Sequence, residues 1–105
     1  MLGEFEQLVM LAVLRAGEEA YGVPIRRAIV DGSRRAVSLA AVYKTLTRLE
    51  ERGFVAARVG EPTPERGGRR KRYYTVTAAG RRALRQSVEV LRRMARGLDL
   101  GLEAP

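Results

Sequence analysis

The sequence predicts a mainly α-helical domain that carries one small β-hairpin, and three observations support this fold class. Apolar residues recur at helical spacing through the first half of the chain. The pattern changes to strand-like alternation after Gly53, and a second alternating run, residues 72–76, precedes a final helical pattern. With 105 residues, 46% of them hydrophobic and 30% charged, the chain has room for one folded domain with one working surface.

The first helix is expected over residues 4–16. Two glutamates in its opening turn interact favourably with the positive end of the helix dipole, and a glycine follows the last residue. Its apolar side chains cover most of the helix circumference. One face is therefore expected to meet the core and another, with Leu8 and Leu11, to meet a partner subunit. A helix that is simply central to its own domain is the alternative. A second helix is expected over about residues 21–30, closed by the Asp-Gly-Ser that follows.

The third helix has the clearest pattern, because it begins after Ser38, a good N-cap, and ends before Gly53. One face is apolar at helical spacing, and the opposite face carries small residues, hydroxyls, cations and a ring that can reach base edges or phosphates. These candidate DNA-contacting residues are Ser38, Ala40, Ala41, Tyr43, Lys44, Thr47 and Arg48. For Tyr43, packing against the hairpin as a core aromatic is the alternative.

The two alternating runs, residues 55–59 and 72–76, predict an antiparallel hairpin joined by a long connection that is rich in turn formers and cations. The alternation places Tyr74 and Val76 toward the core and Tyr73 near the outer face. The cations expected to contact DNA from this hairpin, or wing, are Arg66, Arg69, Arg70, Lys71 and Arg72. A solubilising loop is the alternative for this run.

Thr77 is expected to cap a last helix over about residues 78–97. Its apolar residues have the spacing of a two-stranded coiled-coil seam and are candidates for dimerisation: Leu84, Val88, Leu91, Ala95 and Leu98. Three helices, a hairpin and a helix are the order of a winged helix-turn-helix domain. We therefore expect a DNA-binding domain over residues 1–77, a dimerisation helix over residues 78–98 and a flexible tail over residues 99–105.

The formal net charge of +8 is concentrated, because residues 34–96 hold 17 basic and 5 acidic side chains while residues 1–33 hold 3 and 5. A polyanionic partner, duplex DNA, is the natural inference. The chain has no Cys, His or Trp, which removes the usual zinc sites, thiol chemistry and His-based catalysis. We expect no enzyme activity, no metal and no cofactor. The apolar run over residues 8–14 is too short to span a bilayer, so no membrane and a cytoplasmic location are expected.

Residues 2–97 resemble the PadR family of bacterial transcriptional regulators. The segments that carry the resemblance are Tyr21-Gly22; Ser38, Tyr43, Leu46, Arg48-Leu49-Glu50 and Gly53; and Arg72-Tyr73-Tyr74, Thr77 and Gly80. The resemblance implies a homodimeric repressor that binds an inverted-repeat operator and dimerises through its C-terminal helix with help from the first. This chain ends like the subgroup with one short C-terminal helix. Lys44 stands where relatives often have proline, and Val23 where many have an aromatic residue.

Some relatives bind small aromatic or drug-like effectors near the dimer interface, often through tryptophan. The resemblance therefore leaves room for an effector of unknown identity, to which no residue of this chain is assigned. Two other functions are compatible with the residues alone. A winged-helix module that binds an acidic protein predicts no preference among duplexes, and a nonspecific nucleic-acid-binding protein predicts similar affinity for all sequences.

Overall fold

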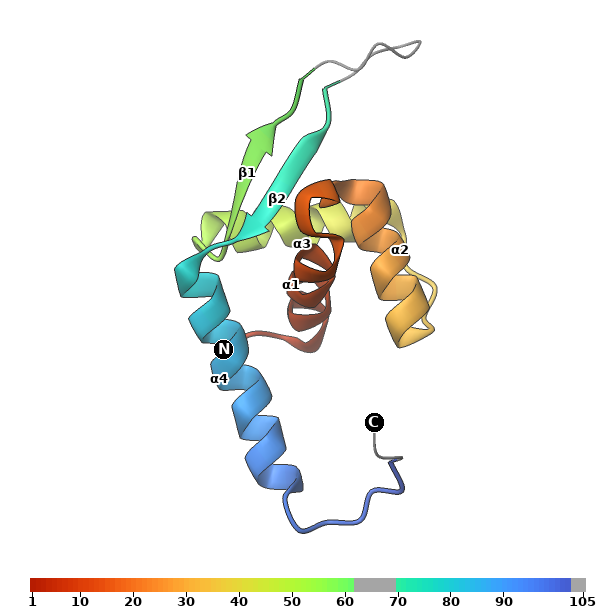
Figure 1. Ribbon diagram of the computed structural model, residues 1–105, viewed down its shortest axis with the longest axis vertical. Helices are drawn as coiled ribbons and strands as arrows, with labels where there is room; N and C mark the ends of the chain where they lie inside the picture. Colours follow the sequence, from red (N-terminus) through yellow and green to blue (C-terminus); the bar gives the residue numbers. More distant parts are fainter. Residues whose placement is uncertain (62–69, 103–105) are drawn as a thin grey trace.

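The computed structural model describes residues 1–61 and 70–102, and its elements follow the predicted order (Figure 1). They are α1 (Glu4–Ala16), the 3-10 helix η1 (Gly17–Glu19), α2 (Gly22–Ser33), α3 (Leu39–Glu51), β1 (Val55–Val59), β2 (Arg72–Val76) and α4 (Ala78–Ala95). The predicted class, mainly α with one hairpin, is confirmed. Among the described residues no helix combines the length and apolarity needed to cross a bilayer.

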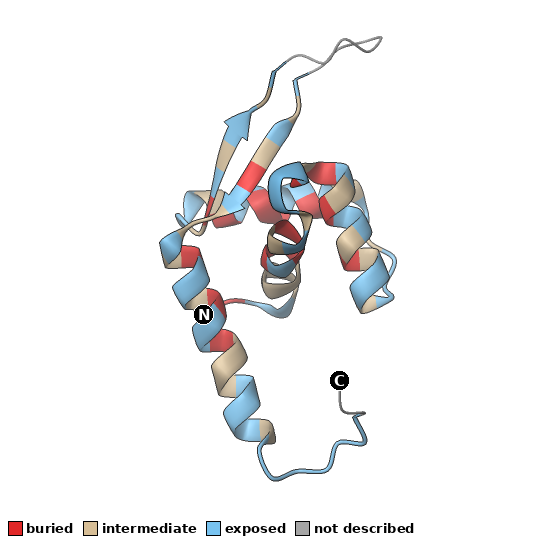
Figure 2. Cartoon of the chain, viewed as in Figure 1, coloured by how far each residue is buried: buried red, intermediate tan, exposed pale blue. Residues whose placement is uncertain are grey.

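The core lies between α1, α2 and α3, and the base of the hairpin and the first turns of α4 complete it. Each helix contributes side chains three or four residues apart, which is the spacing that places them on one face. Figure 2 shows these buried positions on the facing sides of the helices. The largest fully buried side chains are Val9, Met10, Ile25, Val42, Thr45, Leu46, Leu49 and Val55.

The second helix ends three residues later than its sequence predicts, at Ser33 rather than near Val30. The hydroxyl of Ser33 donates a hydrogen bond of 2.6 Å to the carbonyl oxygen of Ile29 and thereby holds the last turn. Arg34 then ends the helix in the left-handed region, at φ 58°, and its amide donates to the carbonyl of Val30. The Asp-Gly-Ser segment therefore continues the helix instead of closing it.

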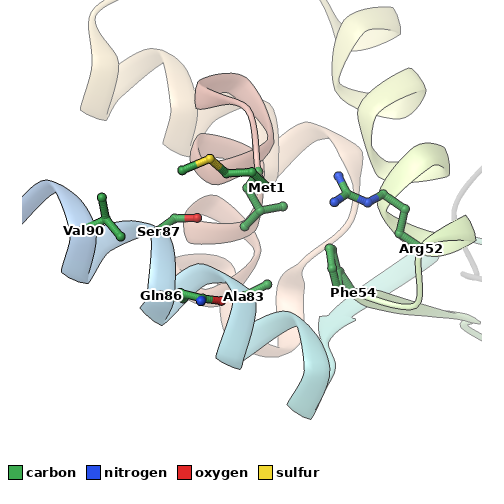
Figure 3. Close-up of a pocket in the computed structure, with 8 residues that line it drawn as sticks. Met1, Arg52, Phe54, Ala83, Gln86, Ser87 and Val90 are labelled. Atoms are coloured by element: carbon green, nitrogen blue, oxygen red, sulfur yellow. The ribbon is translucent and has the colours of Figure 1, made fainter.

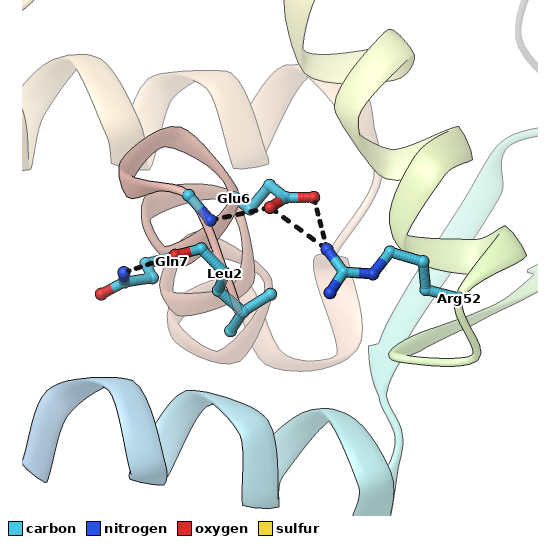
Figure 4. A network of polar contacts seen from close by, with 5 residues as sticks. Leu2, Glu6, Gln7 and Arg52 are labelled. Atoms are coloured by element: carbon cyan, nitrogen blue, oxygen red, sulfur yellow. Dashed lines mark hydrogen bonds and ion pairs between the residues drawn. The ribbon is translucent and has the colours of Figure 1, made fainter. Parts of the chain in front are cut away.

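A polar network joins the start of α1 to the end of α3 (Figure 4). The carboxylate of Glu6 accepts a hydrogen bond of 2.8 Å from the amide of Gly3 and forms an ion pair of 3.1 Å with Arg52. The guanidinium of Arg52 also lies 4.8 Å from the centre of the Phe54 ring. One arginine therefore connects the N-terminal segment, the end of α3 and the turn that leads into β1.

The hairpin is antiparallel, with Val55 opposite Val76 and Ala57 opposite Tyr74. The amide of Tyr74 also donates a hydrogen bond of 2.8 Å to the carbonyl of Ala20, so the segment between η1 and α2 pairs with the outer edge of β2. Tyr74 is buried and Tyr73 is only partly covered, which confirms the orientation predicted from the alternation. The hairpin is thus fixed at its base to the helical core.

The start of α4 is held closely against the turn between α3 and β1. The Thr77 hydroxyl accepts a hydrogen bond from the amide of Gly80 and donates one of 2.6 Å to the carbonyl of Gly53, which confirms it as the cap. A Cβ on Gly80 would lie 2.1 Å from the carbonyl oxygen of Phe54, so only glycine permits this approach. Beyond Val88 the helix leaves the core, and it extends to the opposite end of the molecule from the hairpin (Figure 1).

Candidate nucleic-acid interface

The outer face of α3 carries most of the side chains predicted to contact DNA. Ser38 caps the helix by accepting a hydrogen bond of 3.1 Å from the amide of Ala41, as expected. Ala40, Lys44, Thr47 and Arg48 are exposed together with Tyr43, whereas Ala41 is half-buried. Because the opposite face of α3 is buried in the core, the position of this outer face is fixed relative to the rest of the domain.

Tyr43 has a packing role as well as an exposed edge. It is 40% exposed, and a Cβ placed on Gly22 would lie 2.2 Å from its hydroxyl oxygen. The ring therefore packs on the first residue of α2, at a position where a larger residue would displace it. This contact is with α2 and explains why a glycine follows Tyr21.

The cations on the outer face of α3 retain their charge for a ligand. Within residues 1–61 and 70–102 no carboxylate forms an ion pair with Lys44 or Arg48. Thr47 donates its hydroxyl hydrogen to the carbonyl of Tyr43 at 3.0 Å, which leaves its oxygen able to accept from a base or a water molecule. A helix face with two unpaired cations, a hydroxyl and a small residue suits both phosphate and base-edge contacts.

The wing cations have different environments. Arg66 and Arg69 lie outside the described residues, and Arg70 is exposed. The Lys71 ammonium lies 4.3 Å from the centre of the Tyr21 ring. Arg72 forms an ion pair of 2.9 Å with Glu50 on α3, and hydrogen bonding to that carboxylate raises the pKa of its guanidinium. Arg72 therefore ties the hairpin to α3, and its charge is partly neutralised there.

Arg58 on the wing, and the contacts that it and Tyr73 make, were missed by sequence reasoning. Arg58 on β1 lies 4.6 Å from the centre of the Tyr73 ring, and Tyr73 makes an edge-on contact with Tyr21 at 5.6 Å between ring centres. Together with Lys71 these residues form a cation–aromatic cluster that joins both strands to the start of α2. The basic strand position and the tyrosine pair were visible in the sequence, but their contact depends on tertiary packing.

The residues predicted for dimerisation divide into three groups by burial. Leu84 is only 5% exposed and belongs to the core of its own chain, and Val88 packs against that core. Leu91 and Leu98 are exposed, as is Leu11 on α1, whereas Leu8 and Ala95 are half-buried. Met94, which sequence reasoning did not select, is the most exposed large apolar side chain of α4, at 74%.

A cavity of about 370 Å³ lies beside the middle of α4, where Ala83, Gln86, Ser87 and Val90 line it (Figure 3). Figure 3 shows side chains of α4 on one side and Arg52 and Phe54 on the other, with the N-terminal Met1 between them, and Leu2 also lines the cavity. The start of the chain, the end of the α3 region and α4 therefore meet at this cavity. In the part of the chain that the structure describes, no cluster of three His, Cys, Asp or Glu side chains is suited to hold a metal ion.

An exposed, partly cationic helix on a three-helix core, with a two-stranded hairpin beside it, defines a winged helix-turn-helix domain, a class of DNA-binding protein. The sequence matches the transcriptional regulator PadR-like family over residues 10–86. The chain belongs to this family, and the resemblance inferred from its motifs is confirmed. By family it is a DNA-binding regulator of transcription and not an enzyme.

Similar solved structures support the same fold. A PadR-like transcription factor from Bacteroides fragilis has a TM-score of 0.71 at 21% identity, with 90% of this chain and 86% of that chain covered. A PadR family regulator from Clostridium difficile R20291 has a TM-score of 0.70 at 18% identity, with 94% and 99% covered. One from Eggerthella lenta DSM 2243 has a TM-score of 0.67 at 26% identity, with 97% and 88% covered. Comparison with curated proteins finds no match.

Proposed function

We propose that the protein is a homodimeric repressor that binds an inverted-repeat operator through α3 and the hairpin. The observation that carries this proposal is the outer face of α3, where Lys44 and Arg48 have no carboxylate partner within the described residues. Helices exposed in this way in helix-turn-helix proteins lie in the major groove. Two-fold symmetry would then place two α3 helices in successive major grooves, about one helical turn apart, and the bound dimer would occlude a promoter.

The hairpin supports this arrangement because it lies at the same end of the molecule as α3 (Figure 1). The ion pair between Arg72 and Glu50 joins it directly to the outer side of α3. In this proposal Arg70 and Lys71, together with Arg66 and Arg69 in the connection, contact the phosphate backbone or the adjacent minor groove. The wing thereby adds affinity that depends little on sequence.

Dimerisation is assigned to α4 with help from α1. The C-terminal half of α4 extends beyond the core with Leu91 and Met94 exposed, and Leu98 follows it. An isolated helix end with this much apolar surface is better stabilised when a second copy covers it. The seam of the dimer is thus expected to begin beyond Leu84, which its own core already covers.

Selection of bound fragments from genomic DNA at physiological salt, followed by titration of the enriched sequence, tests the proposal. We expect a palindrome bound by two chains per site, and reduced transcription in vitro from a promoter that contains it. Enrichment of no sequence would favour nonspecific binding. Binding of an acidic protein one-to-one, with no preference among duplexes, would favour an interaction module. Increased transcription would reverse the sign of regulation.

A further inference from the structure

The three residues that lead into α2, Ala20, Tyr21 and Gly22, contact both elements that carry the predicted DNA contacts. The carbonyl of Ala20 accepts a hydrogen bond of 2.8 Å from the amide of Tyr74 in β2. Gly22, the first residue of α2, lies against the Tyr43 hydroxyl on α3, and the space between them has no room for a Cβ. This short segment therefore joins the hairpin to the outer face of α3.

The ring of Tyr21, which lies between these two contacts, packs on side chains of β2. It meets the Tyr73 ring edge-on, with 5.6 Å between the ring centres, and the Lys71 ammonium lies 4.3 Å from the centre of the Tyr21 ring. The Tyr73 ring in turn packs closely over Gly60, where a Cβ would come within 2.5 Å of a ring carbon. Because edge-on and cation–π contacts both require an aromatic ring, an aliphatic residue in place of Tyr21 removes the two contacts together.

The hairpin is attached to the helices through both of its faces. Side chains alternate along a strand, so Arg72 and Tyr73 project from opposite faces of β2. Arg72 forms its ion pair of 2.9 Å with Glu50 on α3, whereas Tyr73 contacts Tyr21 at the start of α2. A two-stranded hairpin has little stability of its own, so its angle to α3 depends on both attachments.

We propose that Tyr21 is a positioning residue for operator binding, whose ring sets the angle of the hairpin to α3 without a contact of its own to DNA. This role rests on the proposed function, in which the hairpin and α3 bind one duplex. A hydrogen bond to a phosphate requires about 3 Å between donor and acceptor, so a small rotation of the hairpin separates Arg70 from the DNA backbone. Phosphate contacts carry no sequence information. Loss of the ring is therefore expected to weaken binding to all duplexes alike and to leave base preference unchanged.

Tyr21→Leu and its matched control Tyr21→Phe test this role, since the first removes the ring and the second removes only the hydroxyl. Fluorescence anisotropy with the selected operator should show binding weaker by about fivefold or more for Tyr21→Leu, and by less than about twofold for Tyr21→Phe. Titration with salt is the readout that a loss of folded protein alone would not change. The slope of log affinity against log salt should become shallower in Tyr21→Leu by about as much as in Arg70→Ala, because in both variants the wing contacts fewer phosphates.

Two further variants test the same contact. Combination of Tyr21→Leu with Arg70→Ala should cost less affinity than the two single losses together, because the displaced hairpin no longer brings Arg70 to the DNA. Gly60→Ala leaves Tyr21 intact and displaces the Tyr73 ring from the other side, so it tests the proposal even if Tyr21→Leu does not fold. We expect a loss of affinity and of slope similar to that of Tyr21→Leu, and no change for the control Gly32→Ala, where a Cβ meets nothing within 4 Å.

Equal losses in Tyr21→Phe and Tyr21→Leu overturn the proposal, because they place the effect in the hydroxyl. Unchanged affinity or an unchanged salt slope in Tyr21→Leu, or additive losses with Arg70→Ala, overturns it as well. A different result marks failure of the proposed function. In that case Arg70→Ala binds the operator as tightly as the wild type and with the same salt slope, so the hairpin makes no contact with DNA for Tyr21 to position.

Discussion

At the scale of single residues, Lys44 offers the most direct test of the DNA interface. Lys44 is exposed on α3. Lys44→Ala is expected to weaken binding to the selected operator by about 5- to 100-fold and to change the preferred bases, because it removes a contact worth about 1–3 kcal/mol. Fluorescence anisotropy with a panel of operator variants measures both effects. Arg27→Ala, which removes an exposed cation from α2, is the matched control and should have little effect on base preference.

Two glycines provide a contrasting pair for stability. A Cβ on Gly80 would lie 2.1 Å from the Phe54 carbonyl oxygen, whereas one on Gly32 meets nothing within 4 Å. Gly80→Ala is therefore expected to destabilise the fold by at least about 2 kcal/mol, since backbone must move. Gly32→Ala, in α2, should stabilise it by about 0.5–1 kcal/mol. Urea denaturation followed by circular dichroism distinguishes them, and equal stability of the two variants would contradict the close approach of α4.

The raised pKa of Tyr74 predicts that the stability of the fold declines at alkaline pH. Burial raises its pKa in the folded chain, although the nearby Arg72 opposes this effect. The folded chain therefore holds the phenolic proton more tightly than the unfolded chain does. The associated stability is fully present below the unfolded pKa of about 10 and is lost as the pH rises from there through the folded value. Denaturation at a series of pH values should show a shallower alkaline decline for Tyr74→Phe than for wild type; identical slopes would show that burial of this phenol is not linked to stability.

At the scale of elements, the junction between the hairpin and α4 depends on one side chain. Thr77 caps α4 and also donates to the carbonyl of Gly53 at the end of the α3 region. Thr77→Val keeps the shape but removes both hydrogen bonds, and we expect a loss of about 1–2 kcal/mol. Thr75→Val, at an exposed position of β2, is the control and should be nearly neutral. Thermal unfolding measures the difference, and similar melting temperatures would argue against the capping role.

At the scale of the whole molecule, DNA affinity and dimerisation are expected to be coupled through α4. The paired substitution Leu91→Glu with Met94→Glu places charge on the exposed apolar face and should convert the dimer to a monomer. If each protomer neutralises about four phosphates, the slope of log affinity against log salt should fall from about −7 to about half that value. Sedimentation velocity and salt titration measure these changes.

Leu102→Glu is a suitable control for the dimer, because Leu102 is exposed and follows α4 in the C-terminal segment. It should leave both the oligomeric state and the salt slope unchanged. A wild-type protein that sediments as a monomer at every concentration would contradict the dimer. Loss of dimerisation in the control alone would instead place the interface in the C-terminal segment.

The sequence by itself determined the features that depend on near neighbours. Helical spacing of apolar residues, the caps at Ser38 and Thr77 and the alternation that buries Tyr74 are all governed by backbone geometry within a few residues, and each was predicted correctly. The exposed residues of α3 followed directly, because a helix with a marked apolar face must present the opposite face outward.

Only the tertiary structure decided how distant segments meet. The pairing of Arg72 with Glu50, the stacking of Arg58 on Tyr73 and the burial of Leu84 within its own chain each join residues of different elements. No local pattern specifies these contacts, because they depend on the angles at which helices and hairpin pack and on the close approaches that glycines allow. The end of α2 was also not predicted correctly, because Arg34, whose backbone lies in the left-handed region, ends the helix, and Gly32 does not. Packing geometry thus determined which of the predicted cations remain available to a ligand and which hold the domain together.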